Sequence, residues 1–399
     1  MPREREPAQP RDAIRRHREA RLRDRADVRL TEGERPHLHA PNELLVARDD
    51  LPSLARTLEE LGATELDTTP GLEERLLRFE VPAEEDLPGA VARLRARGRG
   101  DDLARVAPHH VLSGLPFVQG GPAGFPLAAD ESVDFADGEG DGARVAVLDT
   151  GYTPKLHPWL DDRTRAAPDT LEATDVHPQN GWLDDESGHG TFIAGVVLQQ
   201  APNATIEIAK VLDTEGYGTE LDVARAILDH ADADIINLSL GCYSHDDQPP
   251  LAIAEALRHV SPTTVVVAAA GNDSTHRPLW PAAHKRVLAV GAVDDNLERA
   301  EFSNFGWWVD AGARGVQVLS TFLEFDEAGH ARPIRGRKPQ SFRRWARWSG
   351  TSFAAPKVAG EIAATMTRLG SKSASEAAAA LFASHRGPVD REVGAVFDI

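Results

Sequence analysis

The sequence has 399 residues, 41% of them hydrophobic, and a formal net charge of −19. This length and apolar content predict a folded chain that can hold a large catalytic domain and a smaller one. Residues 113–399 carry 24 basic and 40 acidic side chains, which argues against nucleic acid and anionic membranes as main partners.

The cysteine content and the hydropathy bear on the compartment. Cys242 is the only cysteine, so no intramolecular disulfide can form. The first 25 residues lack the apolar core of a signal peptide, and no apolar run approaches the about 18 residues of a membrane span. We therefore expect a cytoplasmic protein without a transmembrane segment, and export without a leader peptide stays an alternative.

The N-terminal part divides into a charged arm and a small α+β domain. Residues 1–35 mix arginine with acidic residues, which favours a solvated helix or a flexible arm over a functional basic tail. Residues 36–112 show the order strand, helix, strand, helix, strand. The expected strands are 43–48, 75–82 and 105–114, the expected helices are 51–63 and 87–98, and a further strand is expected near 65–69.

A linker and a larger domain follow. Residues 113–142 are rich in Gly, Pro and acidic residues, as linkers are. From 143 to 399, strands alternate with helices, which predicts a mainly parallel α/β sheet with helices on both faces. The expected strands are short apolar runs at 144–149, 205–212, 233–240, 263–271, 286–293 and 316–321.

Three reactive side chains fall at strand or helix ends of this domain, where an open α/β sheet places its ligands. Asp149 ends the apolar strand in RVAVLDTGY, and His189 starts a helix in GHGTFIAGVV. Ser352 in GTSFAAP starts another helix, since Pro356 is expected within its first turn. A serine there lies at the positive end of the helix dipole, which suits a nucleophile; a simple N-cap is the alternative.

A fourth signal is Asn272 in AAAGND, directly after an apolar strand and a glycine. Its amide N–H₂ can donate to an oxyanion that develops during a reaction. Without the other three residues, a plain turn asparagine would be the better interpretation.

Together the motifs VAVLDTG, GHGTFIAGVV, NLSLG, AAAGN and GTSFAAP, in this order, resemble the subtilisin-like serine proteases (subtilases, peptidase S8) over roughly residues 140–370. The resemblance implies a three-layer α/β fold. It also implies that Asp149 orients the histidine, His189 is the general base, and Ser352 is the nucleophile. Asn272 and the backbone N–H of Ser352 would form the oxyanion hole.

The resemblance extends to substrate binding. Ser239, Leu240 and Gly241 match the strand that pairs with an extended peptide, and Ala269, Ala270 and Gly271 match another wall of the main specificity pocket. Leu279 would reach the pocket floor, which implies a shallow pocket for small or medium side chains. The alternative is that Leu279 turns away into packing.

The chain also departs from the family pattern. The usual calcium loop after the histidine helix is absent, and we expect neither a cofactor nor a metal in the reaction. The acidic runs at 160–162 and 183–187 are interpreted as solvated surface rather than weak calcium sites. Cys242 is interpreted as a buried thiol rather than an oxidation sensor. The basic segment 331–348 is interpreted as a solvated loop with packed tryptophans, rather than a contact for an acidic substrate or the linker.

The function implied by these features is that of a serine endopeptidase that forms an acyl-enzyme with its peptide or protein substrate. Residues 36–112 resemble the family's β-α-β-β-α-β propeptides, so we expect an intramolecular chaperone and inhibitor, removed by cleavage somewhere in 112–135. A permanent regulatory domain is the alternative. There are two alternative functions. One is acyl transfer to an amine, as in peptide ligation or cyclisation, and the other is that of a non-catalytic peptide-binding module. An α/β-hydrolase is excluded because no G-x-S-x-G surrounds Ser352.

Overall fold

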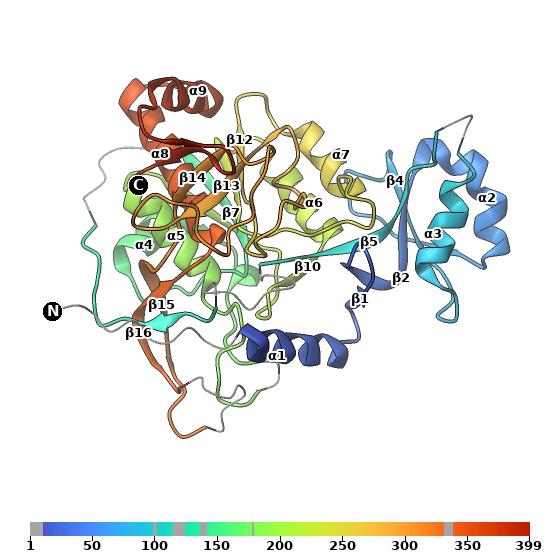
Figure 1. Ribbon diagram of the computed structural model, residues 1–399, viewed down its shortest axis with the longest axis horizontal. Helices are drawn as coiled ribbons and strands as arrows, with labels where there is room; N and C mark the ends of the chain where they lie inside the picture. The colour runs from blue at the N-terminus through green and yellow to red at the C-terminus, as the bar shows by residue number, and fades with distance from the viewer. Residues whose placement is uncertain (1–10, 99–101, 115–123, 136–141, 178, 331–337) are drawn as a thin grey trace.

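The computed structural model describes residues 11–98, 102–114, 124–135, 142–177, 179–330 and 338–399 (Figure 1). A small N-terminal module lies at one end of the molecule, and a larger α/β domain forms the rest.

The N-terminal module is built on an antiparallel sheet with two helices. Its elements are β2 (His37–Ala47), the 3₁₀ turn η1 (Arg48–Asp50), α2 (Leu51–Glu60), β3 (Thr64–Leu66), β4 (Leu76–Glu80), α3 (Leu87–Arg95) and β5 (Val106–Ser113). The strands lie in the order β5-β2-β4-β3, and a core of buried leucines, including Leu54 and Leu94, joins the helices to them. The extra strand expected near 65–69 corresponds to β3.

The sheet of the module continues into the larger domain. Strand β10 (Tyr217–Thr219) pairs with β5 in antiparallel register, with Tyr217 opposite Ser113 and Thr219 opposite Val111. One sheet therefore joins the module to the α/β domain across the end of β5.

The N-terminal arm differs from the solvated or flexible segment expected for residues 1–35. Its described part contains helix α1 (Arg11–Asp24) and strand β1 (Arg29–Thr31), which pairs with β2. Arg18 of α1 is buried, and Val28 belongs to a small apolar cluster with Tyr217 of β10. The arm is thus packed against the rest of the chain from α1 onward.

The α/β domain has a nine-stranded, mainly parallel sheet between two layers of helices. Its order is β17-β18-β14-β13-β12-β11-β7-β9-β8, and only the pair β17–β18 is antiparallel. The strands are β7 (Arg144–Asp149), β8 (Thr164–Ala166), β9 (Thr205–Lys210), β11 (Ile235–Leu238), β12 (Val265–Ala269), β13 (Val287–Val293), β14 (Ala311–Arg314), β17 (Val389–Asp390) and β18 (Gly394–Phe397).

Alternating side chains of the strands explain the three layers. Val145 and Val147 of β7 belong to one hydrophobic cluster, whereas Ala146 and Leu148 belong to the cluster on the opposite face. A strand buried on both faces reads as a continuous apolar run, which is why the sequence predicted these strands. The helices are α4 (Pro158–Arg163), the 3₁₀ turn η2 (Pro168–Thr170), α5 (His189–Gln200), α6 (Glu220–Asp229), α7 (Leu251–His259), α8 (Thr351–Leu369) and α9 (Ala374–Ser384).

The expected strand at 316–321 does not belong to the parallel sheet. It forms part of β15 (Val318–Asp326), which pairs antiparallel with β16 (Ser341–Trp348), and β6 (Leu127–Ala128) of the linker pairs with β16. Apolar alternation does not tell a parallel strand from an antiparallel one, and the many arginines of 341–348 suggested a loop. In β16 the buried residues Phe342, Ala346 and Trp348 alternate with arginines on the other face.

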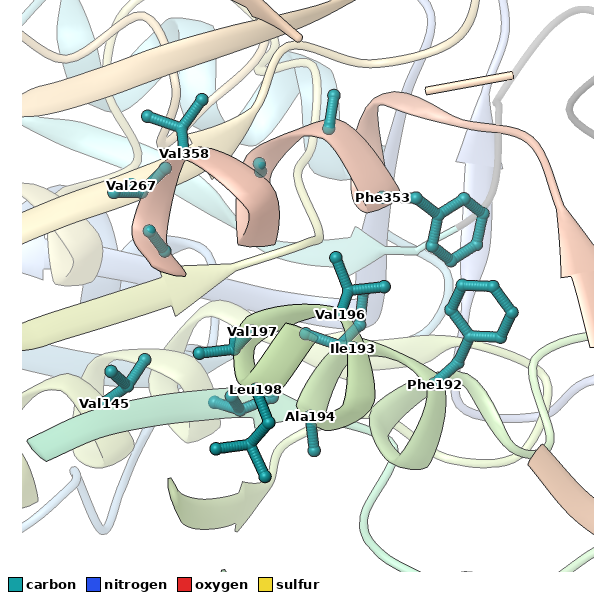
Figure 2. Close-up of a cluster of buried hydrophobic side chains, with 14 of the residues drawn as sticks. Val145, Phe192, Ile193, Ala194, Val196, Val197, Leu198, Val267, Phe353 and Val358 are labelled. Carbon is teal, nitrogen blue, oxygen red and sulfur yellow. The ribbon is translucent and has the colours of Figure 1, made fainter. Parts of the chain in front are cut away.

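Helices α5 and α8 pack together over the sheet and form the centre of the larger core (Figure 2). Phe192 of α5 and Phe353 of α8 face each other with ring centroids 4.7 Å apart. Residues 189–198 of α5 are all buried, so this helix is enclosed on every side. The first residues of both helices are thereby held beside the carboxyl ends of the central strands β7 and β11.

Gly190 in α5 permits the close approach of this helix to the end of β7. A Cβ atom at Gly190 would lie 2.1 Å from the carbonyl oxygen of Gly151, a backbone atom that cannot move alone. We expect Gly190→Ala to lower the free energy of unfolding by about 3 kcal/mol, because overpacking against backbone forces the helix outward. Denaturant unfolding in a Ser352→Ala background, which prevents self-digestion, measures the loss.

Gly89→Ala in α3 is the matched control. A Cβ atom there meets only the carboxylate tip of Asp86, which is able to rotate. Its unfolding free energy should stay within about 1 kcal/mol of the parent. Equal losses in the two variants would contradict the argument for Gly190.

Candidate active site

Asp149 and His189 form a buried pair where β7 ends and α5 begins. His189 Nδ1 lies 2.7 Å from Asp149 Oδ1, and neither side chain is exposed to solvent. The backbone N–H of Thr150 also donates to Asp149 Oδ1, at 2.8 Å. These contacts fix the orientation of the imidazole, with Nδ1 turned to Asp149 and Nε2 on the other side of the ring.

A half-buried carboxylate, Glu172, holds the start of α5 beside this pair. Glu172 Oε1 accepts hydrogen bonds from the Thr150 hydroxyl at 2.6 Å and from the backbone N–H of Gly188 at 2.7 Å. Its other oxygen accepts from the Thr191 hydroxyl at 2.9 Å. Burial raises the pKa of Glu172. The sequence did not point to this residue, because it lies in an irregular segment without a recognisable motif.

Glu186 is a buried carboxylate, and it faces the other nitrogen of the imidazole. Its Oε2 lies 3.5 Å from His189 Nε2 and accepts no hydrogen bond from the part of the chain that the structure describes. Burial raises the pKa of Glu186 to about 7. Burial by itself would lower the pKa of His189, but the charges of Asp149 and Glu186 outweigh it and raise that pKa to about 9.

Replacing Glu186 by glutamine should therefore lower the pKa of His189. Glutamine keeps the shape but removes a negative charge beside the imidazole, so the charged imidazolium loses a stabilising neighbour. The unfolded histidine titrates near its ordinary value, so the stabilisation from the imidazolium is complete below that value and is lost as the pH rises through about 9.

An NMR titration of labelled histidine in a Ser352→Ala background measures this effect. We expect the midpoint for His189 to fall by about one unit or more in Glu186→Gln. Asp49→Asn, which removes an exposed carboxylate of the module, is the control with the same change in net charge. An unchanged midpoint in Glu186→Gln would show that Glu186 does not act on the imidazole.

Ser352 lies in the first turn of α8, and its side chain is 4% exposed. Its hydroxyl donates weakly to the carbonyl oxygen of Ser239, at 3.4 Å. The rings of Phe353 and Trp348 lie 5.4 and 5.3 Å from that of His189, so the start of α8 and the histidine share one apolar wall.

Pro356 lies further into α8 than the expected first turn. The helix begins at Thr351, so the missing N–H of Pro356 leaves the carbonyl of Ser352, four residues earlier, without its helical donor. The hydroxyl of Ser239 donates to this carbonyl at 2.9 Å and replaces the lost hydrogen bond. Ser239, predicted as a substrate-binding residue, thus also fixes the backbone at Ser352.

Asn272 is held next to Ser352 by Thr351, the first residue of α8. Its Oδ1 accepts from the backbone N–H of Thr351 at 2.8 Å and from the Thr351 hydroxyl at 3.0 Å. The amide nitrogen Nδ2 therefore turns the other way, and a Cβ atom at Gly350 would lie 3.6 Å from it. Asn272 and Ser352 both line the pocket beside the start of α8.

A pocket opens beside Ser352. Of the seven residues predicted to bind substrate, it is lined by Ser239, Leu240, Gly241, Ala269, Gly271 and Leu279. Ala270 is buried outside the lining, and its carbonyl accepts from Asn304 Nδ2 at 2.8 Å. A Cβ atom at Gly241 would lie 2.6 Å from Leu279 Cδ2, so the leucine side chain does cover the pocket glycines rather than turn away.

The end of β5 in the N-terminal module lies in this cleft as an extended strand. Ser113 and Gly241 exchange two backbone hydrogen bonds, of 2.8 and 2.9 Å, and Gly114 N donates to the carbonyl of Gly216 at 3.0 Å. Val111, Ser113 and Gly114 also line the pocket. The chain thus supplies its own peptide strand to a groove between residues 216–219 and 239–241, which is the geometry of β-augmentation.

Buried polar contacts hold the module against the α/β domain around this strand. The carboxylate of Glu220, which is fully buried, accepts from the backbone N–H of His110 at 2.9 Å. Arg95 of α3 pairs with Asp246 at 2.6 Å, and Arg277 donates to the carbonyl of Pro36 at 2.7 Å. The module is therefore docked by specific donors and acceptors and not only by apolar contact.

The acidic run 183–187 is buried, so its interpretation as solvated surface was wrong, and both acidic runs have protein partners. Asp161 accepts from the Tyr152 hydroxyl, and Asp184 from the Thr214 hydroxyl. In the part of the chain that the structure describes, no three His, Cys, Asp or Glu side chains gather as a metal site would require. Cys242 is buried, which raises the pKa of its thiol.

The described part of the basic segment 331–348 contacts the linker rather than forming a solvated loop. Trp348 is buried and donates from its indole nitrogen to the carbonyl of Gly124 at 2.6 Å, and Arg347 lies 3.4 Å from Glu131. Trp345 is half-buried, with its ring near that of Phe135. Residues 331–337 lie outside the described residues.

Comparisons with known proteins agree with this geometry. The profile of the subtilase family, peptidase S8, matches residues 140–395. The thermophilic serine proteinase of Bacillus sp. (strain AK1) is 39% identical over 233 residues, which is 55% of this chain and 51% of that protein. The chain thus spans about half the length of this relative. Thermitase of Thermoactinomyces vulgaris is 35% identical over 267 residues, or 64% of this chain and 84% of that protein.

Among solved structures, the chain is similar to fervidolysin from Fervidobacterium pennivorans, described as a keratinolytic enzyme related to subtilisin. The TM-score is 0.63 at 20% identity, over 93% of this chain and 61% of that one. At this identity the likeness concerns the fold. No helix within the described residues is both long and apolar enough to cross a membrane.

Proposed function

Because the chain belongs to the subtilase family, which is shown by the match over residues 140–395, we propose that it is a serine endopeptidase with Ser352 as its nucleophile. The observation that carries this proposal is the buried Asp149–His189 pair, whose imidazole shares one apolar wall with the helix that begins at Ser352. Beside it lies a cleft that already holds an extended strand of the chain.

In the proposed reaction, His189 Nε2 takes the proton of the Ser352 hydroxyl while its oxygen attacks the substrate carbonyl. Asp149 holds the proton on Nδ1 and stabilises the imidazolium that forms. Asn272 Nδ2 and the backbone N–H of Ser352 donate to the oxyanion. The imidazolium then protonates the leaving amine, and water hydrolyses the acyl-enzyme by the reverse sequence of proton transfers. These steps use protein groups and water only.

The cleft supports a preference for extended peptides with small or medium side chains. The carbonyl of Gly216 and the backbone N–H and carbonyl of Gly241 bind the backbone of a strand, so these hydrogen bonds select a strand and not a sequence. Leu279 occupies space over Gly241 and Gly271, which shortens the pocket beside Ser352. Product length and sequence from a peptide library test this preference directly.

We further propose that the N-terminal module inhibits the enzyme until it is cut away. The pairing of Ser113 with Gly241 and of Gly114 with Gly216 supports this role, because a substrate strand would need the same backbone groups. We call residues 111–114, the end of the module that lies in the cleft, the tail. The bound tail competes with substrate directly. It also lies where the expected cleavage region, 112–135, begins.

The experiment is intact mass after expression, for the wild type beside Ser352→Ala. Loss of about 112–135 residues in the wild type alone would support Ser352 as the nucleophile and the module as a self-removed inhibitor. If both chains stay whole and the wild type hydrolyses peptides freely, the module is neither a propeptide nor an inhibitor. If both stay whole and inactive, adding another protease to release the module separates a permanent inhibitor from a dead enzyme.

A further inference from the structure

Four acidic residues on two loops form a surface at the rim of the cleft. Asp184 and Asp185 lie just before α5, and Asp213 and Glu215 lie just before β10; we call these four residues the acidic rim. Basic residues of the N-terminal arm cover it. The ion pairs are His17–Asp185 (3.8 Å), Arg18–Asp185 (3.8 Å), Arg21–Asp184 (3.7 Å), Arg21–Glu215, Arg25–Asp213 (2.6 Å) and Arg25–Glu215 (3.1 Å).

These pairs are sheltered from solvent, unlike most ion pairs on a protein surface. The side chains of Arg18, Arg21 and Arg25 are 8%, 18% and 11% exposed, and that of Glu215 is 6% exposed. Sheltered charges are less screened by salt and water than exposed ones. Burial opposes ionisation of Asp185, but His17 and Arg18 outweigh it and lower its pKa. The guanidinium of Arg25 also lies 5.0 Å from the centre of the Tyr217 ring.

The two loops of the acidic rim connect directly to the cleft. Glu186 N donates to the carbonyl of Thr214 at 2.9 Å, which joins the loops, and His189 N donates to the carbonyl of Glu186 at 3.1 Å. Tyr217 starts β10, which pairs with the tail of the module. The ring of His17 also meets that of Phe125 in the linker, at 6.5 Å. A helix bound to the rim therefore restrains both the strand that holds the tail and the loop before His189.

We propose that the acidic rim is a docking surface for a basic helix, that the chain's own α1 is its occupant, and that this contact strengthens inhibition by the tail. The inhibitor then has two parts, a strand that fills the cleft and a helix that keeps the cleft closed around it. The proposal rests on the proposed inhibitory function of the module. The basic side chains of the arm explain why it binds to a domain with so many acidic side chains.

The test compares two variants with the same loss of three positive charges. The first changes Arg18, Arg21 and Arg25 to glutamine. The control changes Arg23, Arg56 and Arg93 to glutamine; they form ion pairs within the arm or the module, with Glu19, Glu60 and Glu85. In full-length protein, the rate at which peptidase activity appears should rise about tenfold in the first variant and stay unchanged in the control.

Hydrogen exchange in a Ser352→Ala background gives a readout that needs no activity. Amides of β5 and β10 should exchange about tenfold faster when Arg18, Arg21 and Arg25 are changed, whereas those of β7 should not change. Exchange that is equal in the variant, the control and the parent would overturn the proposal.

Charge reversal keeps the test independent of general destabilisation. Arg21→Glu should speed release of the tail, because it places a negative charge against Asp184 and Glu215, whereas Arg23→Glu on the exposed face of α1 should not. Equal release rates in the two reversed variants would overturn the proposal. If instead the wild type is uninhibited from the start, the inhibitory function of the module fails, which is a different result from an inhibited chain that ignores α1.

Discussion

Replacing Ser352 by alanine is expected to lower turnover of a peptide substrate by about 10⁶-fold, as in subtilisin. The change removes the one atom that forms the acyl-enzyme bond in the proposed reaction. It should leave the fold intact, because the hydroxyl makes only a long hydrogen bond of 3.4 Å to the carbonyl of Ser239. Steady-state hydrolysis and thermal unfolding measure the two effects separately.

Ser349→Ala is the matched control for this variant. Ser349 is buried three residues before the nucleophile, and its hydroxyl accepts from the backbone N–H of Gln317 at 2.9 Å. We expect it to change stability and to leave turnover within a few-fold, since it lies outside the site. A serine-directed phosphonofluoridate should label the parent at Ser352, as read by mass spectrometry. Labelling at another serine, or residual turnover near that of the parent, would show that the nucleophile is misassigned.

Replacing Asn272 is expected to lower kcat by about 10²–10³-fold with little change in KM. A donor to the oxyanion acts on charge that develops only in the transition state, so its loss affects kcat rather than ground-state binding. Alanine also removes the acceptor of the two hydrogen bonds from Thr351, so it should cost stability as well. Kinetics and denaturant unfolding of Asn272→Ala therefore report two losses at once.

The variant Asn272→Asp separates the loss of kcat from the loss of stability. Aspartate keeps an oxygen that accepts from Thr351, but it places a second acceptor where Nδ2 stands. We expect its stability to recover toward that of the parent, while kcat stays at least as low as in Asn272→Ala. If the aspartate variant recovered kcat together with stability, Asn272 would be a residue that only positions Thr351.

The parts of the fold that could be predicted are those where one local pattern determines one structure. Apolar runs predicted β7, β9, β11, β12 and β13, because strands buried on both faces are continuous runs of apolar residues. The short strands β8 and β10 were not predicted. The pairing of β16 with β15 and β6 was also missed, since its exposed arginines match those of a solvated loop and β6 lies in the distant linker.

The same distinction applies to the site. Asp149, His189, Asn272 and Ser352 stand in motifs at element ends, so the sequence pointed to them. Glu172 and Glu186 lie in irregular segments, and only the folded chain brings their carboxylates to the two sides of the start of α5. The contact of α1 with the acidic rim joins residues about 165–195 positions apart in the sequence, which no local pattern encodes.

The tail and the cleft belong to one chain, and this fixes how the enzyme can be switched on. A tethered segment experiences an effective concentration on the order of millimolar, whatever the dilution of the protein. A tail of only micromolar affinity would then fill its own cleft in about 999 of 1,000 molecules. One cut between Gly114 and β7 would reduce that concentration to the amount of free module in solution. The contacts that inhibit the intact chain would keep the same strength after the cut. The module would nevertheless dissociate on dilution, and the cleft would then be free for substrate.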